Sequence, residues 1–210
     1  MYALRRSFLI FCLLVDVSAA SPPASGDLGP KGKMGIELVE NKSYDRAIQF
    51  LEDGLIETPD NPVLYENLGV AYLGCSSSLE SETCLKKAEQ SMDKAIALGG
   101  HATFIVDRSL DKLHLVKGTN LLNMKRGLLQ IGKGQIVFKP NKDEAGVITI
   151  PQDDLKSFGL NSYTGKTINM FHLSTKKQGN LDFRTADFSS DEARLLFRLI
   201  ERNLGVSPKK

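Results

Sequence analysis

The sequence is poor in the residues on which metal binding and nucleophilic catalysis depend. Among its 210 residues it has three histidines, three cysteines and no tryptophan. His101, His114 and His172 lie in separate segments, and none stands at ligand spacing from Cys75 or Cys84, which disfavours a zinc site. The sequence also has no His-Glu-x-x-His motif and no Gly-x-Ser-x-Gly motif. We therefore expect no metal, no cofactor and no enzymatic activity.

The sequence also lacks the patterns of two kinds of anion recognition, a phosphate-binding loop and a nucleic-acid-binding surface. Gly165, Lys166 and Thr167 look like the end of a phosphate-binding loop, but Leu160 stands where that loop requires a glycine. We read this segment as a turn. The basic residues do not alternate with a row of aromatic residues, and the formal net charge is only +2. Nucleic acid is therefore not an expected partner.

A long apolar run is also missing. The apolar residues 8–15 follow Arg5 and Arg6 and precede small residues, which is the arrangement of a secretory signal peptide. A membrane-spanning helix needs roughly 20 apolar residues. The sequence predicts a signal peptide over 1–20, a flexible leader over 21–30, and export to the periplasm or the extracellular space. An uncleaved anchor at the membrane surface stays the alternative, because Asp16 interrupts the apolar stretch.

Cleavage of that leader removes Cys12 and leaves Cys75 and Cys84. An even pair of cysteines in an oxidising compartment favours a disulfide. Two free buried thiols are the alternative interpretation. Closing a loop of this size stabilises a fold by about 2–3 kcal/mol, so we assign the pair a structural role.

Charge is distributed unevenly along the chain. Residues 31–99 contain seven Lys and Arg against twelve Asp and Glu, whereas residues 100–210 contain eighteen against eleven. This asymmetry, with Gly99 and Gly100 at the boundary, predicts two domains. It also predicts that the two halves attract one another, or that the basic half meets an anionic surface.

The acidic half carries a spaced pattern of small residues. Gly35, Ala47 and Pro59 lie at intervals of twelve, and Gly69 repeats Gly35 after 34 residues. Apolar spacing predicts helices over 31–41 and 44–57, and the proline-rich turn at 58–62 ends the second one. Ala88 follows Ala47 after 41 residues instead of 34, so seven residues are inserted between the next two helices, where the cysteines lie.

This pattern resembles the tetratricopeptide repeat, a helix-turn-helix unit of 34 residues. The resemblance implies a groove lined by the first helix of each pair, where a protein or peptide binds. On this sequence the groove positions are Ile36, Glu40, Val63, Glu66, Asn67 and Val70. Repeat proteins that clamp a C-terminal carboxylate use Lys, Arg and Asn at such positions, and Asn67 alone fits that pattern. Because two repeats leave an exposed end, the C-terminal half is an alternative occupant of this face.

Beyond Gly100 the pattern changes to short alternating stretches, followed by one amphipathic helix. Ser189 and Glu192 stand in capping-box spacing at the start of that helix. Its apolar face comprises Ala193, Leu196, Phe197, Ile200 and Leu204. The expected strands cover 103–106, 113–116, 128–131, 135–138, 147–150, 167–173 and 181–184, with a tight turn at 132–134.

Seven strands followed by one helix resemble a pleckstrin-homology-like barrel, over residues 101–206, with 207–210 as a tail. That family carries a tryptophan in the closing helix, whose place Phe197 would take here. Another small antiparallel sheet with a packed helix is the alternative. The resemblance implies an anion-binding surface near the first strands. Its candidate residues are Lys112, Lys117, Lys125, Arg126, Lys133 and Lys139.

The sequence thus predicts an α+β protein with two tetratricopeptide-like hairpins followed by a small antiparallel β-barrel and a closing helix. We expect an exported adaptor or scaffold that binds a protein or peptide, with Glu40, Glu66 and Asn67 supplying polar specificity. The alternative is a membrane-surface module whose basic C-terminal half binds anionic lipid.

Overall fold

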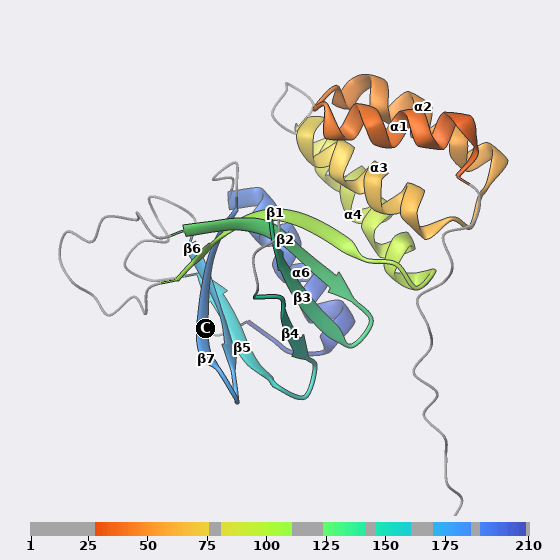
Figure 1. Cartoon of the computed structure of the whole chain (residues 1–210). Helices are drawn as coiled ribbons and strands as arrows, with labels where there is room; N and C mark the ends of the chain where they lie inside the picture. The colour runs from red at the N-terminus through yellow and green to blue at the C-terminus, as the bar shows by residue number, and fades with distance from the viewer. Residues whose placement is uncertain are drawn as a thin grey trace, which may run out of the picture.

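A computed structural model of the chain describes residues 28–75, 81–110, 124–141, 146–160, 170–185 and 190–208. Within these residues, four helices precede a seven-stranded antiparallel sheet, and a last helix packs against both parts (Figure 1). The protein is therefore α+β, as the sequence predicts.

The first four helices are α1 (Gly29–Glu40), α2 (Tyr44–Glu57), α3 (Pro62–Cys75) and α4 (Ser81–Ala97). The bounds predicted for α2 are confirmed, and α1 begins two residues earlier than expected, with Pro30 in its first turn. The side-chain oxygen of Asn61 caps α3 by accepting a hydrogen bond of 3.0 Å from the backbone nitrogen of Val63.

Glycines allow these helices to pack closely in pairs. A methyl group added at Gly35 of α1 would lie 2.7 Å from Cγ of Leu51 on α2. One added at Gly69 of α3 would lie 2.6 Å from Cγ of Met92 on α4. The predicted packing of small residues against large ones is thus present in both helix pairs, at glycines 34 residues apart.

The strands are hydrogen-bonded in the order β4-β3-β2-β1-β7-β6-β5, and every neighbouring pair is antiparallel. Their bounds are β1 (Ala102–Ser109), β2 (Met124–Gly132), β3 (Gln135–Pro140), β4 (Ile148–Pro151), β5 (Leu155–Leu160), β6 (Met170–Thr175) and β7 (Gly179–Thr185). The expected closure into a barrel is wrong, because the end strands β4 and β5 do not pair among these residues. The edge strand β4 is only four residues long and ends at Pro151, which has no N–H to donate.

Most of the expected strands coincide with observed ones. The predictions at 103–106, 128–131, 135–138, 147–150, 167–173 and 181–184 overlap β1, β2, β3, β4, β6 and β7. The tight turn between β2 and β3 is confirmed, with Gly134 at a φ of 77°. The stretch at 113–116 lies outside the described residues, and β5 was not predicted.

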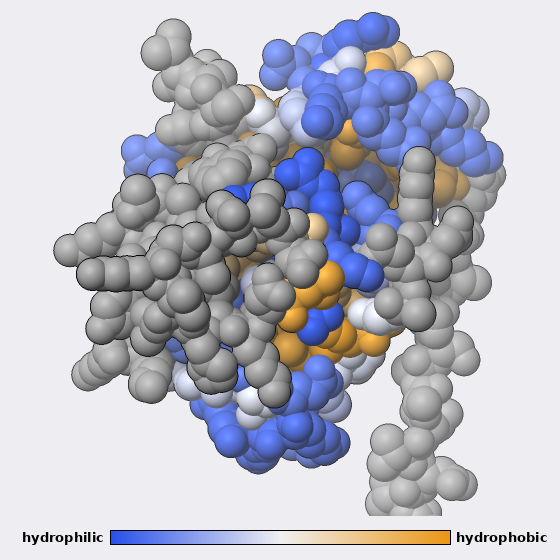
Figure 2. All heavy atoms as spheres, turned by 60° about the vertical axis from the view of Figure 1, so that its left-hand side comes forward, coloured by the Kyte–Doolittle hydropathy of each residue, from blue (hydrophilic) through white to orange (hydrophobic). Residues whose placement is uncertain are grey.

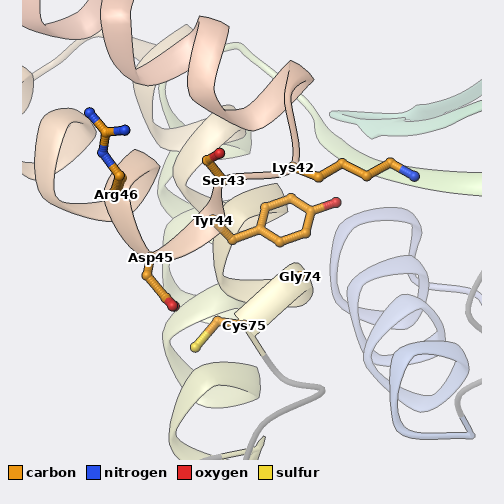
Figure 3. A pocket seen from close by; sticks show the side chains of 7 residues that line it. All are labelled: Lys42, Ser43, Tyr44, Asp45, Arg46, Gly74 and Cys75. Carbon is orange, nitrogen blue, oxygen red and sulfur yellow. The ribbon is translucent and has the colours of Figure 1, made fainter.

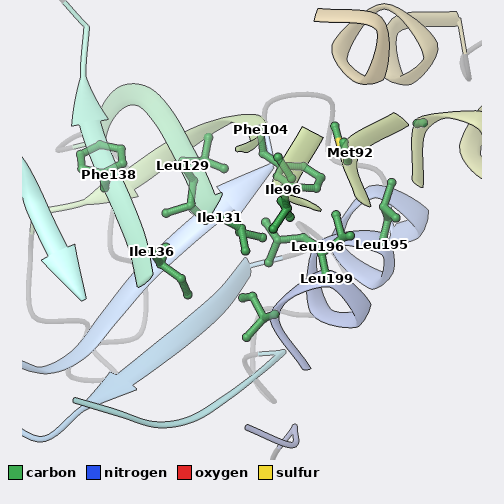
Figure 4. Close-up of a cluster of buried hydrophobic side chains, with 14 of the residues drawn as sticks. Met92, Ile96, Phe104, Leu129, Ile131, Ile136, Phe138, Leu195, Leu196 and Leu199 are labelled. Atoms are coloured by element: carbon green, nitrogen blue, oxygen red, sulfur yellow. The ribbon is translucent and has the colours of Figure 1, made fainter. Parts of the chain in front are cut away.

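The last helix, α6 (Ser190–Leu204), uses two faces (Figure 4). Leu196 and Ile200 are buried on the face that the sequence predicts, but Leu195 and Leu199 are fully buried as well. Figure 4 shows the labelled leucines of α6 beside Ile96 of α4 and close to the sheet. Because the buried residues of both halves form one continuous cluster, the helices and the sheet share a hydrophobic core.

Other predictions also fall on parts of the chain that the structure does not describe. These include the signal peptide at 1–20, the leader up to residue 27, the turn at Gly165, Lys166 and Thr167, and the capping residue Ser189. Within the described segments, no helix has the length and apolar character needed to cross a membrane.

Candidate functional site

The disulfide predicted from the sequence is present. Cys75 at the end of α3 and Cys84 in the first turns of α4 are bonded, with their Cα atoms 6.1 Å apart. Cys84 is buried, at 3% exposure. The bond therefore joins the two helices across the enlarged turn, as a structural crosslink.

An open pocket of about 360 Å³ lies between the start of α2 and the end of α3 (Figure 3). Its lining residues include Lys42, Asp45, Arg46 and Cys75. In Figure 3 the side chains of Lys42, Asp45 and Arg46 point in different directions and do not converge on one point. The pocket therefore does not define a ligand site.

The predicted groove residues lie on α1 and α3, which pack against each other. Ile36 on α1 is half-buried and Glu40 is exposed. On α3, Val63 and Val70 are half-buried, one turn or more to either side of Glu66. In the space-filling view, hydrophobic atoms lie among hydrophilic side chains over the helices, and a second hydrophobic patch lies over the sheet (Figure 2). The structure thus places partly accessible apolar side chains on the face that the repeat resemblance implies.

Glu66 connects this face to the sheet. Its Oε1 atom accepts a hydrogen bond from the hydroxyl of Thr103 on β1 and one of 3.2 Å from Nε2 of Gln130 on β2. Gln130 also donates to the Thr103 hydroxyl oxygen at 3.3 Å. The C-terminal half, the alternative occupant of the groove, therefore contacts this face at Glu66 but leaves Glu66, Val63 and Val70 partly exposed.

Asn67 uses its side chain within its own helix. The amide nitrogen donates a hydrogen bond of 2.8 Å to the backbone oxygen of Val63. This contact holds the amide along the helix surface, and its carbonyl oxygen remains the group that can accept a hydrogen bond from a partner.

The predicted basic surface is dispersed. Lys112 and Lys117 lie outside the described residues. Lys125 is half-buried at the start of β2, whereas Lys133 is exposed in the turn at the far end of that strand. Lys139 is exposed on β3. The three described lysines, Lys125, Lys133 and Lys139, do not form one surface.

Arg126, the remaining member of that predicted set, belongs to a cluster around a buried carboxylate. Its Nε atom donates to Oδ1 of Asp107 at 2.9 Å, and Arg184 donates to Oδ2 at 2.8 Å. The Asp107 side chain is only 7% exposed. Burial alone would raise the pKa of Asp107, but the hydrogen bonds and charges of the two arginines lower it below its ordinary value. The charge of Arg126 is thus largely compensated within the fold.

Arg108 was not singled out by the sequence analysis. In β1 it follows the alternation of the buried residues Phe104 and Val106, and its guanidinium lies 5.9 Å from the ring of Phe138. Its Nε atom is buried without a hydrogen-bond partner, and burial lowers the pKa of Arg108. Lys125 lies directly opposite on β2. The inward position of Arg108 in the alternating stretch is the signal by which the sequence could have identified it.

An ionic network joins α4 to α6. Arg198 donates to Glu89 at 2.7 Å, Arg202 donates to the same carboxylate at 2.6 Å, and Arg202 also pairs with Asp93. Hydrogen bonding from Arg198 lowers the pKa of Glu89, whereas burial raises the pKa of Asp93. The predicted attraction between the acidic and basic halves is present at this contact.

Within the described segments, histidine, cysteine and carboxylate side chains do not gather in groups of three or more that could hold a metal ion. Comparisons of the sequence with models of known protein families and with curated proteins find no match. The site must therefore be interpreted from its own geometry.

Proposed function

We propose that this protein is an exported adaptor that binds a protein or peptide partner through α1 and α3, in a pair of tetratricopeptide-like hairpins. The observation that carries the proposal is the accessible apolar face of α3. Val63 and Val70 are half-buried on either side of Glu66, and Ile36 on α1, which packs against α3, is half-buried as well. The equivalent packing of Gly35 on Leu51 and Gly69 on Met92 supports the repeat interpretation.

The rigidity of α3 also supports this function. Three contacts fix this helix: the disulfide at Cys75, the close packing at Gly69 and the hydrogen bonds of Glu66. A surface that is already ordered loses little conformational entropy when it binds, which favours stoichiometric recognition.

Affinity capture with matched variants tests the proposal. We expect a stoichiometric partner from an envelope extract to bind the wild type and Ile56→Asp, and to be lost by Val70→Asp. Ile56 is the control because it is 80% exposed on α2, away from the proposed face. Its replacement also exchanges an apolar side chain for an aspartate. Capture of the same partner by all three proteins, or by none, would contradict the proposed function.

A second candidate function is anionic lipid binding by the basic C-terminal half. The observation that favours it is Arg108, a half-buried cation whose Nε atom is buried and has no hydrogen-bond partner among the described residues, with Lys125 opposite on the next strand. A partly desolvated cation gains from binding an anion. Co-sedimentation with phosphatidylserine vesicles should fall in Arg108→Gln and persist in Lys133→Gln. Equal sedimentation with neutral phosphatidylcholine vesicles would argue against it.

A further inference from the structure

Glu66 differs from the other buried and half-buried carboxylates described above in the charge of its partners. Asp107 is paired with Arg126 and Arg184, and Glu89 is paired with Arg198. Glu66 accepts hydrogen bonds only from neutral groups among the described residues, namely the Thr103 hydroxyl and the Gln130 amide. Its negative charge is therefore hydrogen-bonded but has no cationic partner within the described segments.

Gln130 supplies a second, independent indication of a missing donor. Its side chain is more than nine-tenths buried, at 9% exposure. The amide nitrogen donates to Glu66 and Thr103, but the amide oxygen Oε1 is buried without a hydrogen-bond partner. A buried acceptor left unpaired is costly, which indicates that this polar junction lacks a donor among the described residues.

We propose that the junction of α3 with β1 and β2 binds a lysine or arginine side chain of the partner, between apolar partner residues that contact Val63 and Val70. This inference rests on the proposed function and assigns a chemistry to the ligand. A cationic donor meets the carboxylate of Glu66 with a charge-assisted hydrogen bond, which is roughly twice as strong as a neutral one.

The surrounding charge favours the same kind of partner. Glu37 and Glu40 are exposed on the side of α1 that also carries Ile36, and they outnumber Lys33 there. Opposite charges across an interface increase the association rate and exclude partners of the wrong sign. The site therefore selects a basic, apolar segment and rejects an acidic one.

Selection from a library of random phage-displayed dodecapeptides on the full, oxidised chain tests the inference. We expect enriched sequences to contain a lysine or arginine flanked by apolar residues. A synthetic peptide of the enriched sequence should bind Glu66→Gln about tenfold more weakly or worse, because one charge-assisted contact is lost. Asp153→Asn, which removes the same charge from the exposed turn after β4, should change the dissociation constant less than twofold.

Replacing the basic peptide residue by norleucine should weaken binding to the wild type but leave binding to Glu66→Gln unchanged. Val70→Asp separates this inference from the proposed function. If Val70→Asp abolishes binding while Glu66→Gln and norleucine have no effect, the cation inference fails and the proposed function stands. If no peptide is enriched, or if neither variant alters binding, both the cation inference and the proposed function fail. Thermal unfolding of each variant must match that of the wild type, and a glutamine at 66 retains an acceptor for Thr103.

Discussion

Gly35 and Gly69 occupy equivalent places in the two helix pairs but face neighbours of different stiffness. A methyl group at Gly35 meets the branched carbon of Leu51 and, at 3.1 Å, its backbone nitrogen. One at Gly69 meets the flexible side chain of Met92. Alanine gains about 1 kcal/mol of helix propensity over glycine, which offsets part of the overpacking.

We therefore expect Gly35→Ala to lower the free energy of unfolding by about 1–2 kcal/mol, and Gly69→Ala to leave it within about 0.5 kcal/mol. Urea denaturation followed by circular dichroism measures both. Glu37→Ala, an exposed change on α1, serves as the control. If Gly69→Ala lowers the free energy of unfolding more than Gly35→Ala does, the stiffness of the neighbouring side chain does not determine the cost of the added methyl group.

Asp107 gives the molecule a specific response to acid. Because Arg126 and Arg184 lower its pKa in the folded state, the ionised carboxylate stabilises the fold above its unfolded pKa of about 3.9. That stabilisation is lost as the pH falls through the lower, folded pKa. We expect Asp107→Asn to lower the free energy of unfolding by about 3 kcal/mol at pH 7, with the difference from wild type shrinking below about pH 4. Chemical denaturation across this range measures it.

Asp153→Asn is the matched control, because this carboxylate lies exposed in the turn after β4. A constant difference between Asp107→Asn and wild type from pH 7 to pH 3 would contradict the assignment of the stabilisation to the charge of Asp107.

Single residues were predictable from sequence where local spacing carries the information. The pairing of Cys75 with Cys84 was predicted from the number of cysteines and from the predicted export, since no other cysteine remains after the predicted cleavage. Glu66 lies on α3 as expected, but its bond to Gln130 joins residues 64 apart and has no local signal. Arg108 was missed because a charged residue in a strand is ordinarily assumed to face solvent.

At the scale of elements, predictability depends on how regular the pattern is. The bounds of α2 are confirmed because apolar residues recur at helical spacing and a proline-rich turn ends it. Strand β5 was missed because a bulge between Leu155 and Ser157 breaks the alternation. The second face of α6 was missed because Leu195 and Leu199 lie outside the stripe expected for a helix that packs on one surface.

The connection between α3 and α4 depends on the disulfide. The cysteines are nine residues apart, so the crosslink restricts the unfolded chain by about 2.5 kcal/mol in the loop-entropy estimate. We expect the double variant Cys75→Ala and Cys84→Ala to lose about that free energy of unfolding in urea denaturation. Alanine is chosen because Cys84 is buried and a hydroxyl there would need a partner.

Wild-type protein reduced with dithiothreitol is the control for that experiment. It should unfold at the same urea concentration as the double variant, and the variant itself should not respond to the reductant. A double variant as stable as the oxidised wild type would show that the crosslink contributes nothing to the fold.

At the scale of the whole molecule, α6 packs against α4, the last of the first four helices. It thereby covers an end that two helical hairpins alone would leave exposed. It buries Leu195, Leu196, Leu199 and Ile200 and packs against both α4 and β2, so both halves depend on it (Figure 4). Arg198 and Arg202 then pair with the acidic residues of α4 at the edge of this contact. The charge asymmetry of the sequence therefore supports an intramolecular contact.

If α6 belongs to both halves, a change in its core face must destabilise the helices and the sheet together. We expect Leu199→Ala to lower the free energy of unfolding by about 2–5 kcal/mol, because this side chain is fully buried. Amide hydrogen exchange, read by mass spectrometry, should then accelerate in α1 to α4 and in β1 to β3 by the same factor. Removing the exposed charges with Arg198→Ala and Arg202→Ala should cost only about 1 kcal/mol. Faster exchange in the sheet with unchanged exchange in the helices would show two independent domains joined at Gly99 and Gly100.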